Sequence, residues 1–302
     1  GQTAGIGGSR KEIRKRILYI ASYRRETGNR RLKSRLLYLL TAALVICTTP
    51  SASALAFSSD RYRAALPQAS LEDLSSYFGD FLYDSSENRY LISNEDDART
   101  RISPNSTYKI YSALIALDAG IITAKDSAMA WNGEACPFDS WNRDQNLNTA
   151  MTNSVNWYFM NLDRQSGLDS IKRELTALSY GNLDFSGGLS RFWLESSLKI
   201  SPLEQVKLLA ALSGHTLPYS ERDMETVKDA LFLSSDGTSS LYGKTGTGTV
   251  DGKNTNGWFI GFIESENGSC SFAVHINGDD GATGTKAGEI ALRILKEKQL
   301  YG

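Results

Sequence analysis

The chain has 302 residues, of which 41% are hydrophobic and 22% are charged, enough for one large globular domain or two small ones. Its formal net charge of −1 is unevenly spread, because residues 10–35 hold 11 Lys and Arg against two Glu, a net of +9, so residues 36–302 carry −10. Three cysteines without metal-ligand spacing and only two histidines, far apart in the chain, argue against a disulfide framework, a zinc or other metal site and a Ser-His-Asp triad.

The basic segment 1–35 is followed by an apolar run, Leu36–Ala56. This run predicts one membrane-spanning helix, with the positive segment in the cytoplasm and the acidic body outside the cell. The small residues Ala52 and Ala54 also fit a signal-peptide cleavage site, and this alternative stays open. We favour the anchor, because residues 1–35 are a long lead for a signal peptide. Positive charge beside a membrane explains the basic segment with fewer assumptions than nucleic-acid binding, so no nucleic-acid partner is expected.

Residues 57–302 contain no internal repeat and no low-complexity linker, which indicates one domain. Aromatic-rich runs around a turn at 79–94 predict a hairpin, and a long, mainly helical middle follows. The end of the chain predicts three strands with the sequences YGKTGTGTV, GWFIGFIE and CSFAVHIN, and then a helix over Gly284–Gln299. Strands at both ends around a helical centre predict an α+β domain with one antiparallel sheet.

The segment SPNSTYKIYSALIALDAG, residues 103–120, predicts a helix capped by Asn105 and ended by Gly120. Its apolar stripe, extended back by one turn, reaches Ser106 and Lys109, so both side chains are expected to point toward the core or a cleft beside it. Burial and the helix dipole lower the pKa of a lysine placed there. A neutral lysine beside a serine can take the hydroxyl proton, which makes Ser106 a candidate nucleophile.

Two later motifs strengthen this interpretation. Ser154 and Asn156 lie two residues apart inside a helical pattern and can face a shared cleft. Lys244 then opens the sequence KTGTGT, whose small residues let a ligand approach the backbone closely. Each motif alone also fits a solvated surface. In order, S-x-x-K, S-x-N and K-T-G match the set used by penicillin-recognising serine acyl-transfer proteins.

The chain resembles two relatives within this group. PNSTYKIYSAL is similar to the nucleophile segment of class D β-lactamases, with Tyr108 where those enzymes usually have Phe, and YGN at 180–182 and FWLESSLKISPLEQ at 192–205 are similar too. The resemblance to the C-terminal sensor domain of BlaR/MecR-type β-lactam receptors is closer and covers nearly the whole chain. It includes DQNLNTAMTNSVNWYF, YGKTGTG and the basic RKRILYIASYRR. The resemblance implies a transpeptidase-like fold with a mainly helical lobe.

The resemblance also implies a role for each site residue. Ser106 would be acylated by a β-lactam, Lys109 would be its base, and Ser154 would shuttle protons. Lys109 would be carboxylated by carbon dioxide in the resting state, with Trp193 helping to hold the carbamate, and no other cofactor is expected. The groups expected to bind the β-lactam are Lys244, Thr245, Gly246, Thr247 and Asn156, and the backbone N–H groups of Ser106 and Thr247 would form the oxyanion hole.

Asn156 separates the candidate functions. Class D enzymes typically carry an apolar residue at this position, whereas an amide beside Lys109 can compete with the carbamate and leave the deacylating water without a base. This favours a membrane-anchored sensor with slow or no deacylation over a class D hydrolase. A wall-synthesis D,D-peptidase would share the three motifs but not YGN or the Trp193 segment. The zinc peptidase expected upstream in such receptors, with its H-E-x-x-H motif, is not in this sequence.

Overall fold

The computed structural model describes residues 42–49, 91–92, 94–266 and 268–301. They belong to one compact unit, Leu40–Gly302. The basic segment 1–35 lies outside the described residues.

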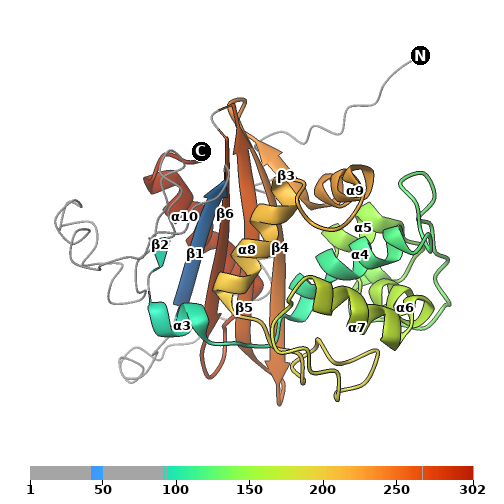
Figure 1. Cartoon of the computed structure of the whole chain (residues 1–302). Helices are drawn as coiled ribbons and strands as arrows, with labels where there is room; N and C mark the ends of the chain where they lie inside the picture. The colour runs from blue at the N-terminus through green and yellow to red at the C-terminus, as the bar shows by residue number, and fades with distance from the viewer. Residues whose placement is uncertain (1–41, 50–90, 93, 267, 302) are drawn as a thin grey trace. The chain divides into compact units, whose positions relative to one another are not determined.

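A six-stranded antiparallel sheet is the centre of this unit (Figure 1). Its order is β2-β1-β6-β5-β4-β3. The strands are β1 (Ala42–Thr49), β2 (Leu91–Ile92), β3 (Phe232–Ser235), β4 (Ser239–Val250), β5 (Lys253–Ser265) and β6 (Gly268–Asn277). The three strands predicted near the end of the chain are therefore confirmed as β4, β5 and β6, joined by short turns.

Two helices cover opposite faces of the sheet. Along β5 the buried side chains alternate: Trp258 and Ile260 join the larger core, whereas Phe259 joins the core beneath α10 (Gly284–Glu297). The other face packs against α8 (Pro202–Ser213), as Figure 1 shows. The predicted C-terminal helix is thus confirmed, and it ends two residues earlier than expected.

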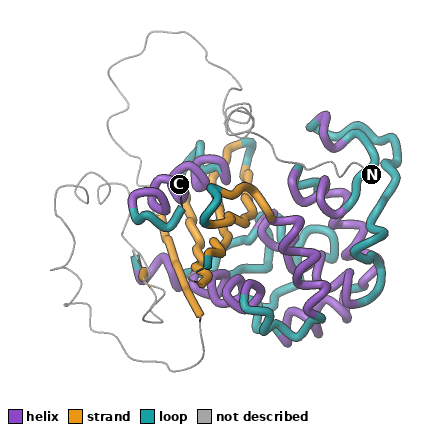
Figure 2. Tube along the Cα trace, turned by 90° about the horizontal axis from the view of Figure 1, so that it is seen from above, coloured by secondary structure: helices purple, strands orange, loops and turns teal. Residues whose placement is uncertain are grey.

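A helical lobe lies beside the β4 side of the sheet (Figures 1 and 2). Its members are α4 (Lys109–Asp118), α5 (Leu147–Thr152), α6 (Asn156–Ser166), α7 (Leu168–Ala177) and α9 (Glu221–Leu231). Shorter helices are α3 (Glu95–Arg99), η2 (Asn105–Tyr108) and η3 (Asp139–Trp141). The buried side chains of the lobe and of α8 form one continuous core. This arrangement confirms the predicted α+β class with a mainly helical lobe.

The segment Ala42–Thr49 is a strand in this structure and not part of the helix predicted over Leu36–Ala56. It pairs along its full length with β6, from Ala42 opposite Ile276 to Thr49 opposite Ser269. The segment is rich in β-branched residues, and a short apolar run of this kind fits a strand as well as a helix. No helix among the described residues is long and apolar enough to cross a membrane.

Two local predictions also need correction. The predicted 103–120 helix begins as the 3-10 turn η2, and Asn105 does not cap it, because its φ of 49° is left-handed and its side chain bonds elsewhere. Ser154 is not inside a helix but in the turn between α5 and α6, with a φ of 56°. Of the hairpin predicted over 79–94, the structure describes only the short strand β2, which pairs with β1.

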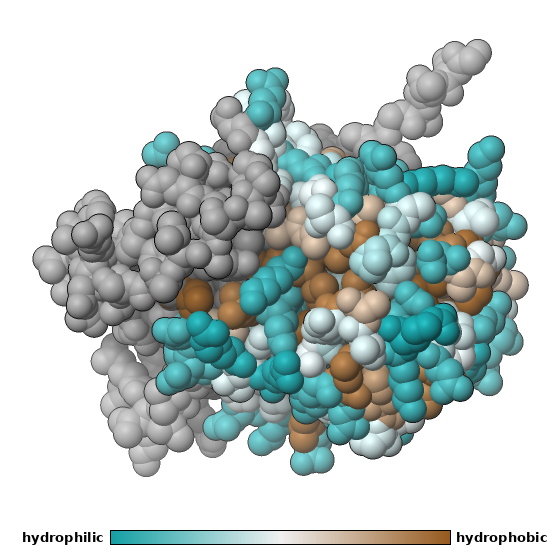
Figure 3. All heavy atoms as spheres, in the orientation of Figure 1, coloured by the Kyte–Doolittle hydropathy of each residue, from teal (hydrophilic) through white to brown (hydrophobic). Residues whose placement is uncertain are grey.

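Large apolar side chains are mostly buried in the described part of the chain. On the face shown in Figure 3, hydrophobic residues lie interspersed with hydrophilic ones. The large hydrophobic residues exposed among the described ones are Phe138, Phe232, Leu233 and Val250. Buried polar groups therefore stand out, and most of them gather where η2 meets the lobe and β4.

Candidate active site

Ser106 lies in η2, directly before the first turn of α4. Its hydroxyl is one turn away from the side chain of Lys109, as the i, i+3 spacing requires. Ser106 is half-buried, whereas Lys109 is completely buried. Helix α4 is buried on every side from Lys109 to Leu117, so the predicted stripe is a wholly enclosed helix. A ligand can therefore approach the hydroxyl of Ser106 while the amine of Lys109 stays behind it.

The Lys109 amine is surrounded by oxygen atoms. Its Nζ lies 2.9 Å from Ser106 Oγ, 2.6 Å from Asn156 Oδ1 and 2.6 Å from the carbonyl oxygen of Ser154, with Ser154 Oγ at 3.1 Å. Burial lowers the pKa of Lys109 well below its usual range, and the charge of Lys244 lowers it further. The charge of Asp163 acts in the opposite direction.

The contacts of Lys109 fix the orientation of its amine when that amine is uncharged. An amide oxygen and a backbone carbonyl can only accept hydrogen bonds, so the two shortest contacts use both N–H groups of an uncharged Lys109. The nitrogen lone pair is then left for the neighbouring hydroxyls, of which that of Ser106 at 2.9 Å is nearer than that of Ser154 at 3.1 Å. In a neutral Lys109 the contact with Asn156 therefore favours an amine that faces the nucleophile, a consequence that the sequence motif alone does not give.

Ser154 connects the two lysines. Its Oγ lies 3.1 Å from Lys109 Nζ and 2.9 Å from Lys244 Nζ. Lys244 is buried, and burial lowers its pKa to about 7. Three separate motifs therefore contribute to one hydrogen-bonded chain of polar side chains. Its members are Ser106, Lys109, Ser154 and Lys244.

Strand β4 presents a free edge to the nucleophile segment. Strand β3 pairs with β4 only from Ser240 to Tyr242, and beyond that point β4 runs beside η2. A Cβ at Gly246 would lie 3.1 Å from the carbonyl oxygen of Pro104 and 3.4 Å from the nitrogen of Ser106. Glycine is therefore what lets the strand lie this close to Ser106.

The two threonines of the K-T-G-T motif both lie beside Gly284, where a Cβ would be 2.9 Å from Thr245 Cβ. Thr245 and Thr247 are both exposed on β4. The Thr247 hydroxyl accepts a hydrogen bond of 2.9 Å from the backbone N–H of Gly284, at the start of α10. The motif is thus fixed to the helix behind the sheet, while its outer side stays open.

Trp193 lies behind Lys109, with its ring centroid 5.4 Å from Nζ. Its indole N–H, however, is donated to Asp163 Oδ2 at 3.1 Å. Both residues are buried. The indole N–H that was expected to help hold a Lys109 carbamate is thus bonded to a carboxylate here.

A second polar cluster holds the residue before the nucleophile. Glu195 Oε1 accepts hydrogen bonds from the side-chain amides of Asn105 and Asn256, each at 2.6 Å, and its backbone N–H donates to Asn105 Oδ1 at 3.2 Å. These contacts offset the cost of the left-handed backbone at Asn105. The cluster therefore stabilises the strained entry to Ser106.

Sequence reasoning missed Asp163, Glu195, Asn105 and Asn256 as parts of this site. Asp163 carried a signal, since it falls one turn after Phe159 on the buried side of α6, where a carboxylate is unusual. Glu195 and Asn256 come from a loop and from a distant strand. No spacing in the sequence indicates that they meet.

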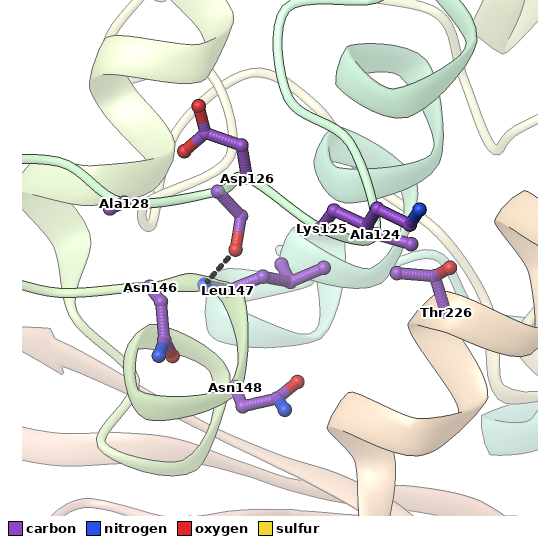
Figure 4. Close-up of a pocket in the computed structure, with 9 residues that line it drawn as sticks. Ala124, Lys125, Asp126, Ala128, Asn146, Leu147, Asn148 and Thr226 are labelled. Atoms are coloured by element: carbon purple, nitrogen blue, oxygen red, sulfur yellow. Dashed lines mark hydrogen bonds between the residues drawn. The ribbon is translucent and has the colours of Figure 1, made fainter.

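A separate pocket lies between the loop 124–128, the start of α5 and α9 (Figure 4). It is lined by Ala124, Lys125, Asp126, Ser127, Ala128, Asn146, Leu147, Asn148 and Thr226, and the Ser127 hydroxyl accepts the Leu147 N–H at 3.1 Å. None of the predicted site residues lines it. The polar chain around Ser106 is therefore the better candidate for chemistry.

Comparison with known families decides the relationship. The family model described as penicillin binding protein transpeptidase domain matches residues 72–296. The chain belongs to this family. The transpeptidase-like fold that the resemblance implied is thereby confirmed.

The relatives confirm the resemblance to the BlaR/MecR group and to class D enzymes. The Regulatory protein BlaR1 of Bacillus licheniformis is 39% identical over 300 residues, which cover 97% of this chain and 50% of that protein. The Methicillin resistance mecR1 protein of Staphylococcus aureus is 39% identical over 298 residues, covering 97% and 51%. The Probable beta-lactamase YbxI of Bacillus subtilis is 41% identical over 216 residues, covering 72% and 79%. The chain thus spans about half the length of the regulatory relatives.

Solved structures give the same two relationships. The C-terminal domain of the Bacillus licheniformis BlaR penicillin-receptor matches with a TM-score of 0.70 and 44% identity, covering 74% of this chain and 90% of that one. A class D beta-lactamase from Bacillus subtilis matches with a TM-score of 0.69 and 33% identity, covering 86% and 92%.

Proposed function

We propose that residues 57–302 are a β-lactam sensor domain that becomes covalently acylated on Ser106 and reports this event across the membrane. The observation that carries the proposal is the hydrogen-bonded chain from Ser106 through Lys109 and Ser154 to Lys244. Similarity to the Regulatory protein BlaR1, to the Methicillin resistance mecR1 protein and to the BlaR penicillin-receptor domain supports the sensor role. Intact mass of the chain after incubation with a penicillin tests the proposal: a stable adduct on Ser106 is expected.

Acylation needs a base, an acid and a place for negative charge. The lone pair of Lys109 takes the Ser106 proton, Ser106 Oγ bonds to the β-lactam carbonyl carbon, and the ring C–N bond breaks. The proton passes from Lys109 through the Ser154 hydroxyl to the β-lactam nitrogen, which leaves when the C–N bond breaks. The backbone N–H groups of Ser106 and Thr247 stabilise the oxyanion, and Gly246 permits the close approach of β4 that this requires.

The carboxylate of the antibiotic needs a cation and donors. Lys244 supplies the charge, and the exposed residues Thr245 and Thr247 supply hydroxyl donors beside it. The Thr247 hydroxyl accepts from the Gly284 N–H and so still has its own proton to donate. Because Lys244 also bonds Ser154, the same cation binds the ligand and polarises the proton path.

Asn156 favours a sensor over the alternative, a class D hydrolase. Held by Asn156 Oδ1 and by the Ser154 carbonyl, the Lys109 lone pair points at Ser106 Oγ, which is an ester oxygen after acylation. The base is then not directed at a hydrolytic water, and the acyl-enzyme persists. The hydrolase alternative is supported by the similarity to the Bacillus subtilis enzymes.

N-carboxylation of Lys109 stays a prediction. The buried, readily deprotonated amine favours it, since only an unprotonated amine adds carbon dioxide. The surrounding acceptors and the bond between Trp193 and Asp163 oppose it. The acylation route above uses the free amine and needs no carbamate.

The pH dependence of acylation tests the role of Lys244. With a pKa of about 7, Lys244 loses its charge as the pH rises through neutrality, so the second-order acylation rate constant is expected to fall above that point. The loss of one charge-assisted hydrogen bond predicts a decrease of roughly tenfold to a hundredfold. In Lys244→Arg, whose side chain stays charged, this alkaline decrease is expected to disappear. Stopped-flow fluorescence measures the acylation rate constant of both proteins. An equal alkaline decrease in the two would exclude Lys244 as its cause.

Membrane attachment and signalling are the parts of the proposal that rest on sequence. The charge step from +9 to −10 across Leu36–Ala56 supports an anchor with the domain outside the cell, and an upstream zinc peptidase would transmit the signal. Pairing of Ala42–Thr49 with β6 and insertion of the same residues into a membrane exclude each other within one molecule.

Protease treatment of intact cells separates these alternatives. For an anchored, exported domain, added protease is expected to digest residues 57–302 while a short membrane-bound fragment remains. A soluble product beginning near Leu55 would instead support a cleaved signal peptide. Complete protection in intact cells, with digestion after lysis, would contradict export.

A further inference from the structure

Asp163 is a buried carboxylate for which the acylation route has no use. It lies on α6, is 1% exposed, and accepts three hydrogen bonds. The Tyr108 hydroxyl donates to Oδ1 at 3.1 Å, the Ser112 hydroxyl donates to Oδ1 at 2.7 Å, and the Trp193 indole donates to Oδ2 at 3.1 Å. Three donors around one carboxylate stabilise its charged form against the cost of burial.

The position of Asp163 bears directly on Lys109. The Trp193 ring lies over the amine, with Nζ 5.4 Å from its centroid, while the indole N–H points to Asp163. Phe159, on the same helix as Asp163, also has its ring at the amine, with Nζ 5.6 Å from the centroid. The carboxylate is thus separated from Lys109 mainly by aromatic rings, and its charge favours the protonated amine.

We propose that Asp163 is a positioning residue that opposes carboxylation of Lys109, both by its negative charge and by holding the indole N–H of Trp193, whose ring lies over this amine. Carboxylation forms a bond between Nζ and the carbon of carbon dioxide, moves one C=O electron pair onto oxygen and releases a proton from the nitrogen to solvent. The product is a second buried anion close to Asp163. Two like charges in a buried site disfavour each other.

The presence of tyrosine at position 108 also supports this inference. Its hydroxyl exists only because this chain has tyrosine where the class D segments that it resembles usually have phenylalanine. That hydroxyl bonds Asp163. Burial raises the pKa of Asp163 to about 7, and the bonds from Ser112, Trp193 and Tyr108 counteract that rise. Each donor therefore helps keep the anion that opposes the carbamate.

The test measures the carbamate itself in the full 302-residue chain. The chain is titrated with ¹³C-bicarbonate above pH 7, and the carbamate signal is followed by ¹³C NMR, with Lys109→Ala as the blank. Asp163→Asn removes the charge but keeps an oxygen for the indole. Half-maximal carboxylation is expected at about tenfold less bicarbonate in this variant, corresponding to one unit of pKa. Asp163→Ala also frees the indole of Trp193, so half-maximal carboxylation is expected at a still lower bicarbonate concentration in this variant.

Matched variants keep the proposal falsifiable. Asp229→Asn removes an exposed carboxylate on α9 and is expected to titrate like the native chain. Tyr108→Phe keeps the ring but removes one donor to Asp163, so its half-maximal bicarbonate concentration is expected to fall, by less than in Asp163→Asn. This variant tests the proposal if the Asp163 variants do not fold. Identical titration curves for the native chain and the folded variants, or an equal shift in Asp229→Asn, would overturn the proposal.

This inference rests on the proposed function only through the role of Lys109 as base. Intact mass after penicillin treatment is recorded for the same samples. Absence of an adduct on Ser106 would refute the proposed acylation whatever the NMR result. An adduct together with unchanged carbamate titration would refute the role of Asp163 alone.

Discussion

Replacing Lys109 with alanine is expected to slow acylation of Ser106 by about 100-fold to 10,000-fold, the usual contribution of a general base. The reason is geometric. Nζ is 2.9 Å from Ser106 Oγ, and two obligate acceptors turn its lone pair toward that oxygen. Quenched-flow intact mass with a penicillin measures the rate at which the adduct forms.

The matched control for this variant is Lys207→Ala, because Lys207 is exposed on α8. It is expected to acylate at the native rate. The Lys109→Ala protein is checked by circular dichroism and thermal unfolding, since a buried lysine stem also fills space. Native acylation kinetics in a folded Lys109→Ala protein would remove Lys109 from the mechanism.

Replacing Asn156 with valine is expected to convert a persistent acyl-enzyme into one that turns over. Valine offers no acceptor, so Lys109 loses one of its two shortest contacts, and its surroundings become apolar on that side. The amine can then rotate toward a water or become carboxylated. An increase in the deacylation rate of about 100-fold is expected if a base is restored.

Penicillin hydrolysis at steady state, followed by absorbance, measures this change. Asn148→Val, at an exposed position on α5, is the control and is expected to behave like the native chain. A folded Asn156→Val protein that acylates but never turns over would contradict the role assigned to the amide. In that case another feature of the site would have to protect the ester.

Much of the site could be predicted from the sequence because its residues fall in three short motifs with fixed spacing. Ser106 and Lys109 are one helical turn apart, and their contact follows from helix geometry alone. The start of α8 is local in the same way, because Ser201 and Glu204 form a capping box and Pro202 occupies the first helical position. Local rules predict well where all partners are close in the chain.

The remaining features depend on contacts between distant segments. Asp163 is bonded by Tyr108, Ser112 and Trp193, which are separated from it by 30 to 55 residues. The left-handed backbone at Asn105 also depends on a distant partner, Glu195, and so could not be foreseen from its own neighbours. Helix capping was the sensible local interpretation of Asn105, and a tertiary contact overrode it.

The apolar segment illustrates a different limit. The residues of Ala42–Thr49 are apolar enough for a membrane and β-branched enough for a strand. In so short a run, the spacing of apolar residues does not distinguish a membrane helix from a strand. In the structure this segment is a strand because it pairs with β6 along its full length.

The central claim is that one domain reacts with one β-lactam and then stops. Intact mass spectrometry of the native chain after incubation with excess penicillin tests it most directly, with Ser106→Ala as the blank. A single adduct of the mass of the opened antibiotic is expected on Ser106, persisting after the free drug is removed and absent in Ser106→Ala. Continued loss of penicillin with no accumulated adduct would contradict the sensor account and favour a class D hydrolase.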